Sequence, residues 1–271
     1  MEERIRIQVS GQLTGEVELI VYPGDRKKQD KKRSAVIICP GGGYWQLVER
    51  EGEPVAKQFV TMGCVAFVLR YSVLPNGFPV SLLELAKAVA IVRARADEWN
   101  IDSNKIVICG FSAGGHLACS LGVFWNHEFV WKAIGESSGT MIQPNGMILG
   151  YPVITSWRYA HNKFVERLFQ YQGGPKEGDQ ELVSLEQQVS KLTPKAFIWQ
   201  TCTDEDVPVE NSMLLANAML QNGLNVELHI FPDGIHGLSL ASKASSGGVC
   251  EFENLHCSLW IKLVEEWLGK I

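Results

Sequence analysis

The chain begins with two segments in which apolar and polar residues alternate, and from residue 34 it changes to short, continuous apolar runs. The alternating segments, residues 4–9 and 16–22, predict strands, which we expect to pair antiparallel at one edge of a sheet. The continuous runs predict the short strands of a mostly parallel sheet. They span residues 34–39, 64–70, 105–109, 147–153, 196–201 and 226–231.

Segments with apolar residues at helical spacing separate these runs, so strands and helices alternate along the chain. Such alternation predicts an α/β fold with a mostly parallel, doubly wound sheet and right-handed crossovers. Sites in such sheets form at the carboxyl ends of the strands. The predicted helices open at Glu53-Pro54, follow Pro75-Asn76-Gly77 and Ser112, and span residues 209–222 and 251–269.

The stretch before the strand at 196–201 is longer than one crossover helix requires. Over about residues 154–195 it holds several aromatic residues and a break at Gly173-Gly174-Pro175. Because it follows a strand, we expect it to lie over the strand ends as a small lid that hinges at the break. A passive surface insertion with its own small core is the alternative. No linker or repeat divides the chain, so residues 1–271 are interpreted as a single domain.

Composition and charge narrow the range of partners. A net charge of −5 argues against nucleic acid or an acidic membrane as the main partner. The basic cluster at residues 26–28 and 31–33 is interpreted as a solvated loop. Residues 1–6 lack the apolar core of a signal peptide and no apolar run is long enough to span a bilayer, so we expect a cytoplasmic protein. The seven cysteines show no Cys-x-x-Cys spacing, and we expect reduced thiols and neither a metal nor another cofactor.

The sequence Gly110-Phe111-Ser112-Ala113-Gly114 stands between a predicted strand and a predicted helix. A Gly-x-Ser-x-Gly motif in that setting is typical of a nucleophile elbow, in which a strained turn exposes the serine hydroxyl at the edge of a sheet. The flanking glycines are needed because a Cβ would collide where strand and helix meet. We therefore interpret Ser112 as a nucleophile.

A serine needs a base to remove its proton, and the base needs a carboxylate to hold its tautomer. Of the six histidines, His236 follows the last predicted strand in a glycine-flanked loop, where its imidazole can reach the strand ends. His116, one helical turn after Ser112, is expected to pack locally. For the acid we prefer Asp204, which is nearest the end of its strand, to Asp206, which stands at a helix start. The order Ser112, Asp204, His236 is that of α/β-hydrolases.

An oxyanion needs at least two N–H donors. Ala113 supplies one at the helix start, and the loop Pro40-Gly41-Gly42-Gly43 supplies the other, for which we nominate Gly42 and Gly43. A phosphate-binding glycine loop is the rival interpretation, but no lysine follows in the P-loop position.

The glycine loop, the elbow followed by His116-Leu117-Ala118, the element Asp204-x-x-Val-Pro and the pair His236-Gly237 resemble bacterial α/β-hydrolase esterases. The resemblance is to those related to the hormone-sensitive-lipase and acetylxylan-esterase groups, and it covers residues 36–240. It implies an α/β-hydrolase fold and an esterase that acts on sugar esters. One departure is Pro40, because the hormone-sensitive-lipase type carries there a histidine that supports the loop.

The leading hypothesis is thus a serine carboxylesterase for short acyl groups, such as acetyl on a sugar or oligosaccharide, that works through an acyl-enzyme. An amidase or peptidase with the same triad, and a non-catalytic binding protein of this fold, are the alternatives, and homo-oligomer formation is left open. The aromatic residues after the glycine loop can line the pocket or pack under the lid, and the insertion can add lining residues. The candidates for pocket lining are Tyr44, Trp45, Trp157 and His161.

Overall fold

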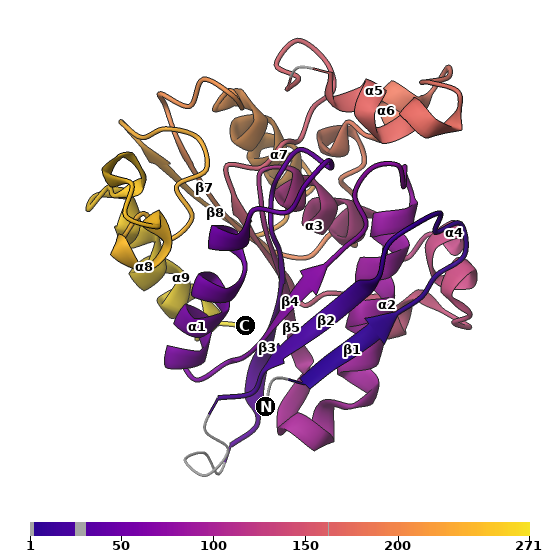
Figure 1. Cartoon of the computed structure of the whole chain (residues 1–271), viewed down its shortest axis with the longest axis horizontal. Coiled ribbons are helices and arrows are strands. Elements are labelled where there is room, and N and C mark those ends of the chain that lie inside the picture. Colours follow the sequence, from indigo (N-terminus) through magenta and orange to yellow (C-terminus); the bar gives the residue numbers. More distant parts are fainter. Residues whose placement is uncertain (1–2, 25–30, 162) are drawn as a thin grey trace.

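A single eight-stranded sheet runs through the molecule (Figure 1). The computed structural model describes residues 3–24, 31–161 and 163–271. The strand order is β1-β2-β4-β3-β5-β6-β7-β8; β2 is antiparallel to β1 and β4, and β3 to β8 are parallel. The predicted mostly parallel sheet with an antiparallel N-terminal edge is confirmed. The strands are β1 (Glu3–Ile7), β2 (Val17–Tyr22), β3 (Arg33–Cys39), β4 (Val65–Arg70), β5 (Ile101–Phe111), β6 (Gly146–Gly150), β7 (Ala196–Thr201) and β8 (Val226–Phe231).

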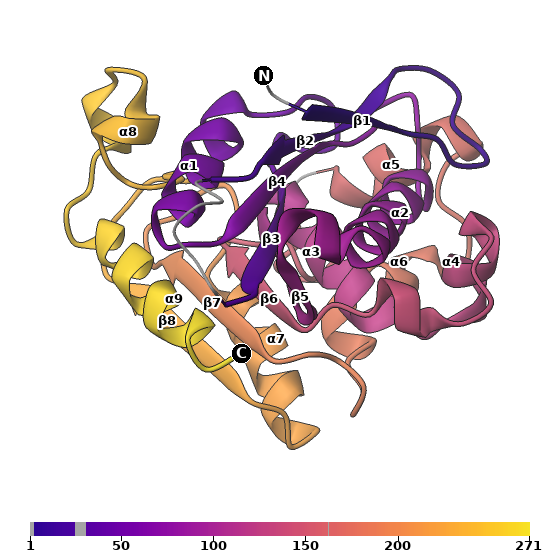
Figure 2. The same cartoon turned by 90° about the horizontal axis from the view of Figure 1, so that it is seen from below.

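Helices cover both faces of the sheet, as the view from below shows (Figure 2). On one face α1 (Glu53–Thr61) and α9 (Trp260–Leu268) bury their apolar side chains against the strands. On the other lie α2 (Val80–Ala94), α3 (Ala113–Phe124) and α7 (Glu210–Gln221). Successive residues of β5 enter opposite cores, because side chains alternate along a strand. The shorter helices are α4 (Glu128–Trp131), α5 (Phe164–Phe169), α6 (Asp179–Leu182) and α8 (Lys243–Ser246).

The predicted closing helix at 251–269 is wrong in its first half. The α-helix begins only at Trp260, after two short 3-10 turns (Cys250–Phe252 and Cys257–Leu259). Between these turns the side chain of Asn254 accepts a hydrogen bond from the Cys257 amide at 3.0 Å. Asparagine competes in this way with helical hydrogen bonding and favours a turn.

The basic cluster is only in part the solvated loop that we expected. Residues 26–28 lie outside the described residues, and Lys31 and Lys32 are exposed. Arg33, however, is the first residue of β3 and is only 5% exposed. Its guanidinium donates to the carbonyls of Pro23 at 2.6 Å and Trp99 at 2.7 Å, so it fastens neighbouring segments at the amino end of the sheet.

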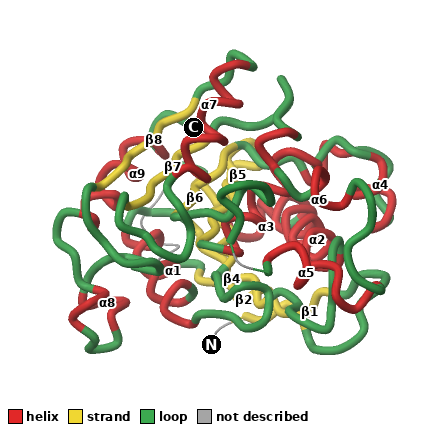
Figure 3. The backbone as a smooth tube through the Cα atoms, turned by 90° about the horizontal axis from the view of Figure 1, so that it is seen from above, coloured by secondary structure: helices red, strands yellow, loops and turns green. Residues whose placement is uncertain are grey.

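The stretch between β6 and β7 holds α5 and α6 and lies beyond the carboxyl ends of the parallel strands (Figure 1). Seen from above, loops gather at this end of the sheet, with α5 and α6 to one side (Figure 3). The chain thus places the insertion on the face where doubly wound sheets form their sites. No helix of the described chain is long and apolar enough to cross a membrane.

Candidate active site

Ser112 occupies a strained turn between β5 and α3. Its φ of 52° and ψ of −121° are rarely adopted by a residue with a side chain, and such conformations persist mainly where the surrounding structure enforces them. The flanking glycines explain how the turn is tolerated. A Cβ on Gly110 would fall on the Gly114 carbonyl, and one on Gly114 would fall on the carbonyl of Cys39 in the neighbouring strand. The turn therefore holds the Ser112 side chain at the carboxyl end of β5.

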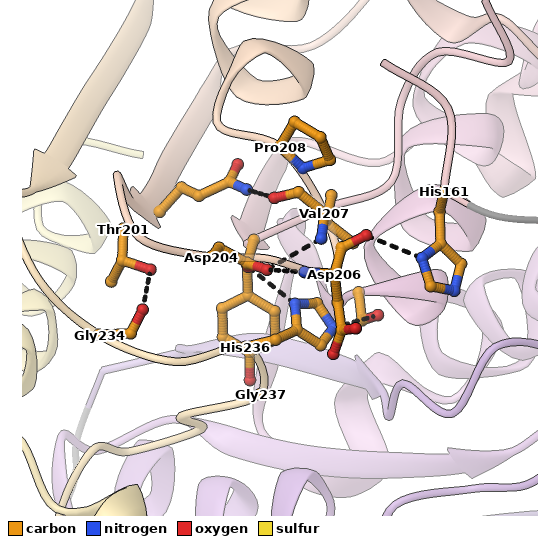
Figure 4. Close-up of polar contacts among 12 residues, drawn as sticks. His161, Thr201, Asp204, Asp206, Val207, Pro208, Gly234, His236 and Gly237 are labelled. Atoms are coloured by element: carbon orange, nitrogen blue, oxygen red, sulfur yellow. Dashed lines mark hydrogen bonds and ion pairs between the residues drawn. The ribbon is translucent and has the colours of Figure 1, made fainter.

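The structure brings Ser112, His236 and Asp204 together in one hydrogen-bonded line. His236 Nε2 lies 2.8 Å from Ser112 Oγ, and its Nδ1 lies 2.7 Å from Asp204 Oδ2 (Figure 4). Because a carboxylate only accepts, Nδ1 carries the proton, and Nε2 is free to accept the hydroxyl proton of Ser112. This is the tautomer that a general base for Ser112 requires.

The two candidate aspartates occupy different positions. The Asp204 side chain is fully buried, and its Oδ1 accepts the amides of Asp206 at 3.0 Å and Val207 at 2.9 Å, which leaves Oδ2 for His236. Asp206 is exposed, and its backbone carbonyl faces His161 Nδ1 at 2.9 Å. The structure thus places Asp204, and not Asp206, against the imidazole.

The loop that carries His236 is fixed from β7. The Thr201 hydroxyl donates to the Gly234 carbonyl at 2.8 Å (Figure 4), and the Gly234 amide donates to the Thr203 hydroxyl at 2.9 Å. Gly234 has a φ of 155°, and a Cβ there would come within 2.7 Å of the Thr201 methyl. These contacts hold the imidazole at the ends of β7 and β8.

The glycine loop after β3 turns toward Ser112. Gly42 and Gly43 have φ values of 123° and 64°, and the Gly42 carbonyl accepts the amides of Trp45 and Gln46. Within the described chain, no protein acceptor is bonded to the amides of Gly42, Gly43 or Ala113. Ala113 is also the first residue of the buried helix α3, whose aligned peptide dipoles favour negative charge at this end. The three predicted donors are therefore without a protein acceptor, and Gly42 and Gly43 line the same cavity as Ser112.

Other residues support the loop in the absence of a histidine at position 40. The Tyr71 hydroxyl donates to the Pro40 carbonyl at 2.6 Å, and the Gly41 amide donates to Glu51 Oε2 at 2.7 Å. Glycine is required at position 41, because a Cβ would come within 2.7 Å of Glu51 Oε2 and 3.0 Å of the Ser112 Cβ.

A cavity of about 210 Å³ opens beside Ser112 and His236. Several residues that line this cavity were not predicted from the sequence. Arg50 donates to the carbonyl of Gly237, and its guanidinium lies 3.8 Å from the centre of the Phe252 ring. Arg167 reaches the cavity from α5, so close to Gly43 that a Cβ there would come within 2.8 Å of Arg167 Nη1. The cavity is lined by Gly42, Gly43, Trp45, Gln46, Val48, Arg50, Glu51, Ser112, His161, Arg167, Asp206, His236 and Gly237.

Two of the four predicted pocket-lining residues reach this cavity. Trp45 lines it and is 67% exposed, and His161 lines it from the insertion. Tyr44 does not line it, because it is 4% exposed and its hydroxyl donates to His116 Nδ1 at 2.9 Å. Its ring meets Phe164 of the insertion, so of the two alternatives packing against the insertion is the one observed. Trp157 is 43% exposed and lies outside the lining.

A second cavity, of about 400 Å³, lies within the insertion and shares His161 with the first. It is formed largely by residues at the start of α5 and around α6, among them Phe164, Glu166 and Lys176. The insertion thus borders both cavities. In the described residues, no group of three or more His, Cys, Asp or Glu side chains is arranged to hold a metal ion.

His116 connects the glycine loop to the insertion. Its Nδ1 accepts from the Tyr44 hydroxyl, its Nε2 donates to the Val183 carbonyl at 3.1 Å, and its ring packs edge-on against Phe164. His116 is completely buried, and this burial lowers the pKa of its imidazole to about 4. The neutral ring therefore fits both partners.

Folding stability should depend on pH through this histidine. The pKa of His116 is about 4 in the folded chain against 6.5 for an unburied imidazole, so its contribution is complete above pH 6.5 and is lost as the pH falls toward 4. The loss amounts to roughly 3 kcal/mol. Burial raises the pKa of the Glu84 carboxyl to about 7, which acts in the opposite sense, so the effect must be measured as a difference between variants.

The measurement is urea unfolding of the wild type and of His116→Gln between about pH 4 and pH 8. We expect the wild type's advantage in free energy of unfolding to shrink by roughly 3 kcal/mol on acidification. A difference that stays constant across this range would contradict the assignment of a neutral, buried imidazole.

The chain is similar to a family model and to proteins named as a xylanase and an acetylxylan esterase. A family model described as BD-FAE matches residues 21–219. The chain is 41% identical over 219 residues to "Endo-1,4-beta-xylanase B" of Butyrivibrio fibrisolvens, covering 79% of this chain and 34% of that protein. It is 34% identical over 217 residues to an acetylxylan esterase of Xylanibacter ruminicola, covering 77% of this chain and 42% of that protein. The chain thus spans between a third and a half of the length of these curated relatives.

Solved structures agree over nearly the whole chain. An acetyl ester-xyloside bifunctional hydrolase from Caldicellulosiruptor lactoaceticus is 35% identical, with a TM-score of 0.81 over 94% of this chain and 88% of that one. A carboxylesterase from Lactobacillus plantarum is 26% identical, with a TM-score of 0.85 over 100% of this chain and 97% of that one. The second likeness covers the whole chain and so includes the elements that position Ser112, Asp204 and His236.

Proposed function

This chain belongs to the BD-FAE family and has the α/β-hydrolase fold, and from that premise we propose that it is a serine carboxylesterase that removes short acyl groups, acetyl above all, from sugars or oligosaccharides. One observation carries the proposal: the line from Ser112 through His236 to Asp204, at 2.8 and 2.7 Å, beside three unbonded amides. Nucleophile, base, acid and oxyanion donors are the parts that acyl transfer by a serine requires.

The proposed reaction begins when Ser112 Oγ attacks the ester carbonyl carbon and its proton passes to His236 Nε2. Asp204 stabilises the imidazolium that forms, since its carboxylate accepts from Nδ1. The carbonyl oxygen becomes an oxyanion, which the amides of Gly42, Gly43 and Ala113 would receive. His236 then gives its proton to the leaving alcohol oxygen as the bond to the acyl carbon breaks. A water molecule then gives a proton to His236 Nε2 as its oxygen attacks the acyl carbon. The bond between the acyl carbon and Ser112 Oγ breaks, the acid is released, and His236 returns the proton to Oγ.

A short acyl group on a sugar fits the dimensions of the site. The cavity of about 210 Å³ beside Ser112 holds little more than a small acyl group and part of an alcohol. Trp45 offers an exposed ring at its edge, and the Arg50 and Arg167 side chains add N–H donors suited to hydroxyl oxygens. The acetylxylan esterase and the acetyl ester-xyloside hydrolase among the relatives support this choice of substrate.

The insertion at about 154–195 is proposed to act as a lid over this site. It contributes His161 and Arg167 to the cavity lining, and it meets the glycine loop through the contacts of His116. Residues at a lid typically control substrate access and release more than the chemical step.

Acyl-chain length should decide the catalytic efficiency. With p-nitrophenyl esters, we expect kcat/KM for acetate or butyrate to exceed that for octanoate by about tenfold or more, because long chains do not fit a cavity of about 210 Å³. We would measure initial rates, and from them kcat/KM, for a series of esters of increasing acyl-chain length. Acetylated xylo-oligosaccharides and an aminoacyl anilide are measured under the same conditions. Preference for octanoate would refute the short-acyl assignment, preference for the anilide would favour an amidase, and inactivity on every compound would favour a binding protein.

A further inference from the structure

Glu51 is a buried carboxylate whose two oxygens join separate parts of the site. It is only 2% exposed and lines the cavity beside Ser112. Its Oε2 accepts the amide of Gly41 at 2.7 Å, and its Oε1 accepts the hydroxyl of Tyr151 at 2.8 Å. Burying a charged group is costly unless hydrogen bonds compensate for the lost water, so such an arrangement calls for a function.

Tyr151 extends the connection to the loop that carries His236. Its hydroxyl accepts the amide of Ser239 at 2.8 Å, and its ring packs edge-on against the His236 ring with centroids 5.1 Å apart. Tyr151 and Ser239 have φ values of 37° and 54°, so both share with Ser112 a positive φ that residues with side chains rarely adopt. Backbone strain of this kind concentrates at functional sites and is maintained by the contacts around it.

We propose that Glu51 is a positioning residue of the esterase reaction: through Gly41 it sets the glycine loop, and through Tyr151 it sets the loop and ring of His236. The proposal rests on the proposed function, because it concerns the same site. Gly41 immediately precedes the proposed oxyanion donors Gly42 and Gly43. A single carboxylate thus fixes the distance between the oxyanion donors and the base, which must match within a fraction of an ångström.

The hydrogen bonds suit the ionised form of Glu51. Both oxygens accept, whereas a glutamine would present an NH₂ group that cannot accept from Gly41 or Tyr151. Burial raises the pKa of the Glu51 carboxyl, and the hydrogen bonds from Tyr151 and Gly41 and the charge of Arg50 oppose that rise.

The test compares Glu51→Gln with Glu84→Gln. Glu84 is a matched control, because it is also a fully buried carboxylate that accepts hydrogen bonds on both oxygens, in its case from the Ser72 amide and hydroxyl. For an acetate ester we expect Glu51→Gln to lower kcat about 10- to 100-fold with KM nearly unchanged, because misplaced oxyanion donors weaken transition-state binding only. Glu84→Gln should leave both kcat and KM close to the wild-type values.

Two further measurements keep the test decisive. Tyr151→Phe removes one oxygen and keeps the Gly41 bond, so its kcat should fall by a smaller factor, about three- to tenfold. In NMR spectra at a fixed pH, the ring-proton resonances of His236 should move in Glu51→Gln and keep their wild-type positions in Glu84→Gln, because Tyr151 packs against that ring. These spectra do not depend on turnover, so they distinguish failure of the positioning role from failure of the proposed esterase.

An active wild type whose Glu51→Gln variant keeps the wild-type kcat would overturn the positioning role and leave the esterase intact. If Glu51→Gln does not fold, wild-type kcat in Tyr151→Phe would overturn the positioning role instead. A wild type inactive on all esters would refute the esterase, and unchanged His236 resonances in Glu51→Gln would then refute the coupling between Glu51 and His236 as well.

Discussion

Replacing Ser112 by alanine should lower kcat for an acetate ester by about a million-fold, because the remaining groups cannot form an acyl-enzyme. The residual rate would come from the oxyanion donors and from binding alone. The fold should survive, since alanine keeps the Cβ that the turn at φ 52° already accommodates and removes only the Oγ atom. Steady-state hydrolysis with purified protein, together with a urea unfolding curve, measures both effects.

Ser120→Ala is the matched control for this variant. Ser120 is a buried serine of α3, the helix that follows Ser112, and its Oγ has no hydrogen-bond partner in the described residues. Its replacement should leave kcat within about threefold of the wild type, since it changes no group near the cavity. If Ser112→Ala retained activity comparable to that of Ser120→Ala, Ser112 would not be the nucleophile.

Asp204→Asn should lower kcat by about ten thousand-fold. An asparagine amide directed at His236 favours the wrong imidazole tautomer and does not stabilise the imidazolium, an exchange that typically costs a triad this much. Asp206→Asn should lower kcat by less than about tenfold, because Asp206 meets His161 through its backbone carbonyl, which the substitution keeps.

Kinetics of the two variants side by side, with KM determined for each, make the comparison. Each substitution removes one negative charge, and the two positions are only two residues apart. Each variant therefore serves as the other's control for general electrostatic effects. The reverse order, with Asp206→Asn as the inactive variant, would exchange the roles assigned to the two aspartates.

The fold and the central side chains could be predicted because they depend on local patterns. Short apolar runs gave the strands, and residues that follow parallel strands must meet at one edge of the sheet. The three central residues illustrate this, because each follows a parallel strand: Ser112 follows β5, Asp204 follows β7 and His236 follows β8. The direction and order of these strands are enough to bring the three side chains together.

The rest of the site depends on packing between distant segments, for which the sequence holds no periodic signal. Tyr44 and Trp45 are neighbours in the chain, yet Tyr44 is buried and its hydroxyl donates to His116, whereas Trp45 is exposed. Arg167 reaches the cavity because of how α5 lies against Gly43. Glu51 likewise lies in a charged stretch of the sequence, where nothing distinguishes it from its polar neighbours. Only the folded chain shows that both of its carboxylate oxygens accept hydrogen bonds inside the protein.

The most direct test of the central claim is to identify the residue that a fluorophosphonate labels. Such a probe reacts with an activated serine hydroxyl and remains attached, so peptide mass spectrometry locates it without reference to the natural substrate. If Ser112 is the nucleophile, we expect one phosphonyl group per chain, on the peptide that contains Ser112, and a loss of esterase activity in proportion to the labelling. Labelling at another residue, or full esterase activity in a chain labelled completely at Ser112, would contradict it.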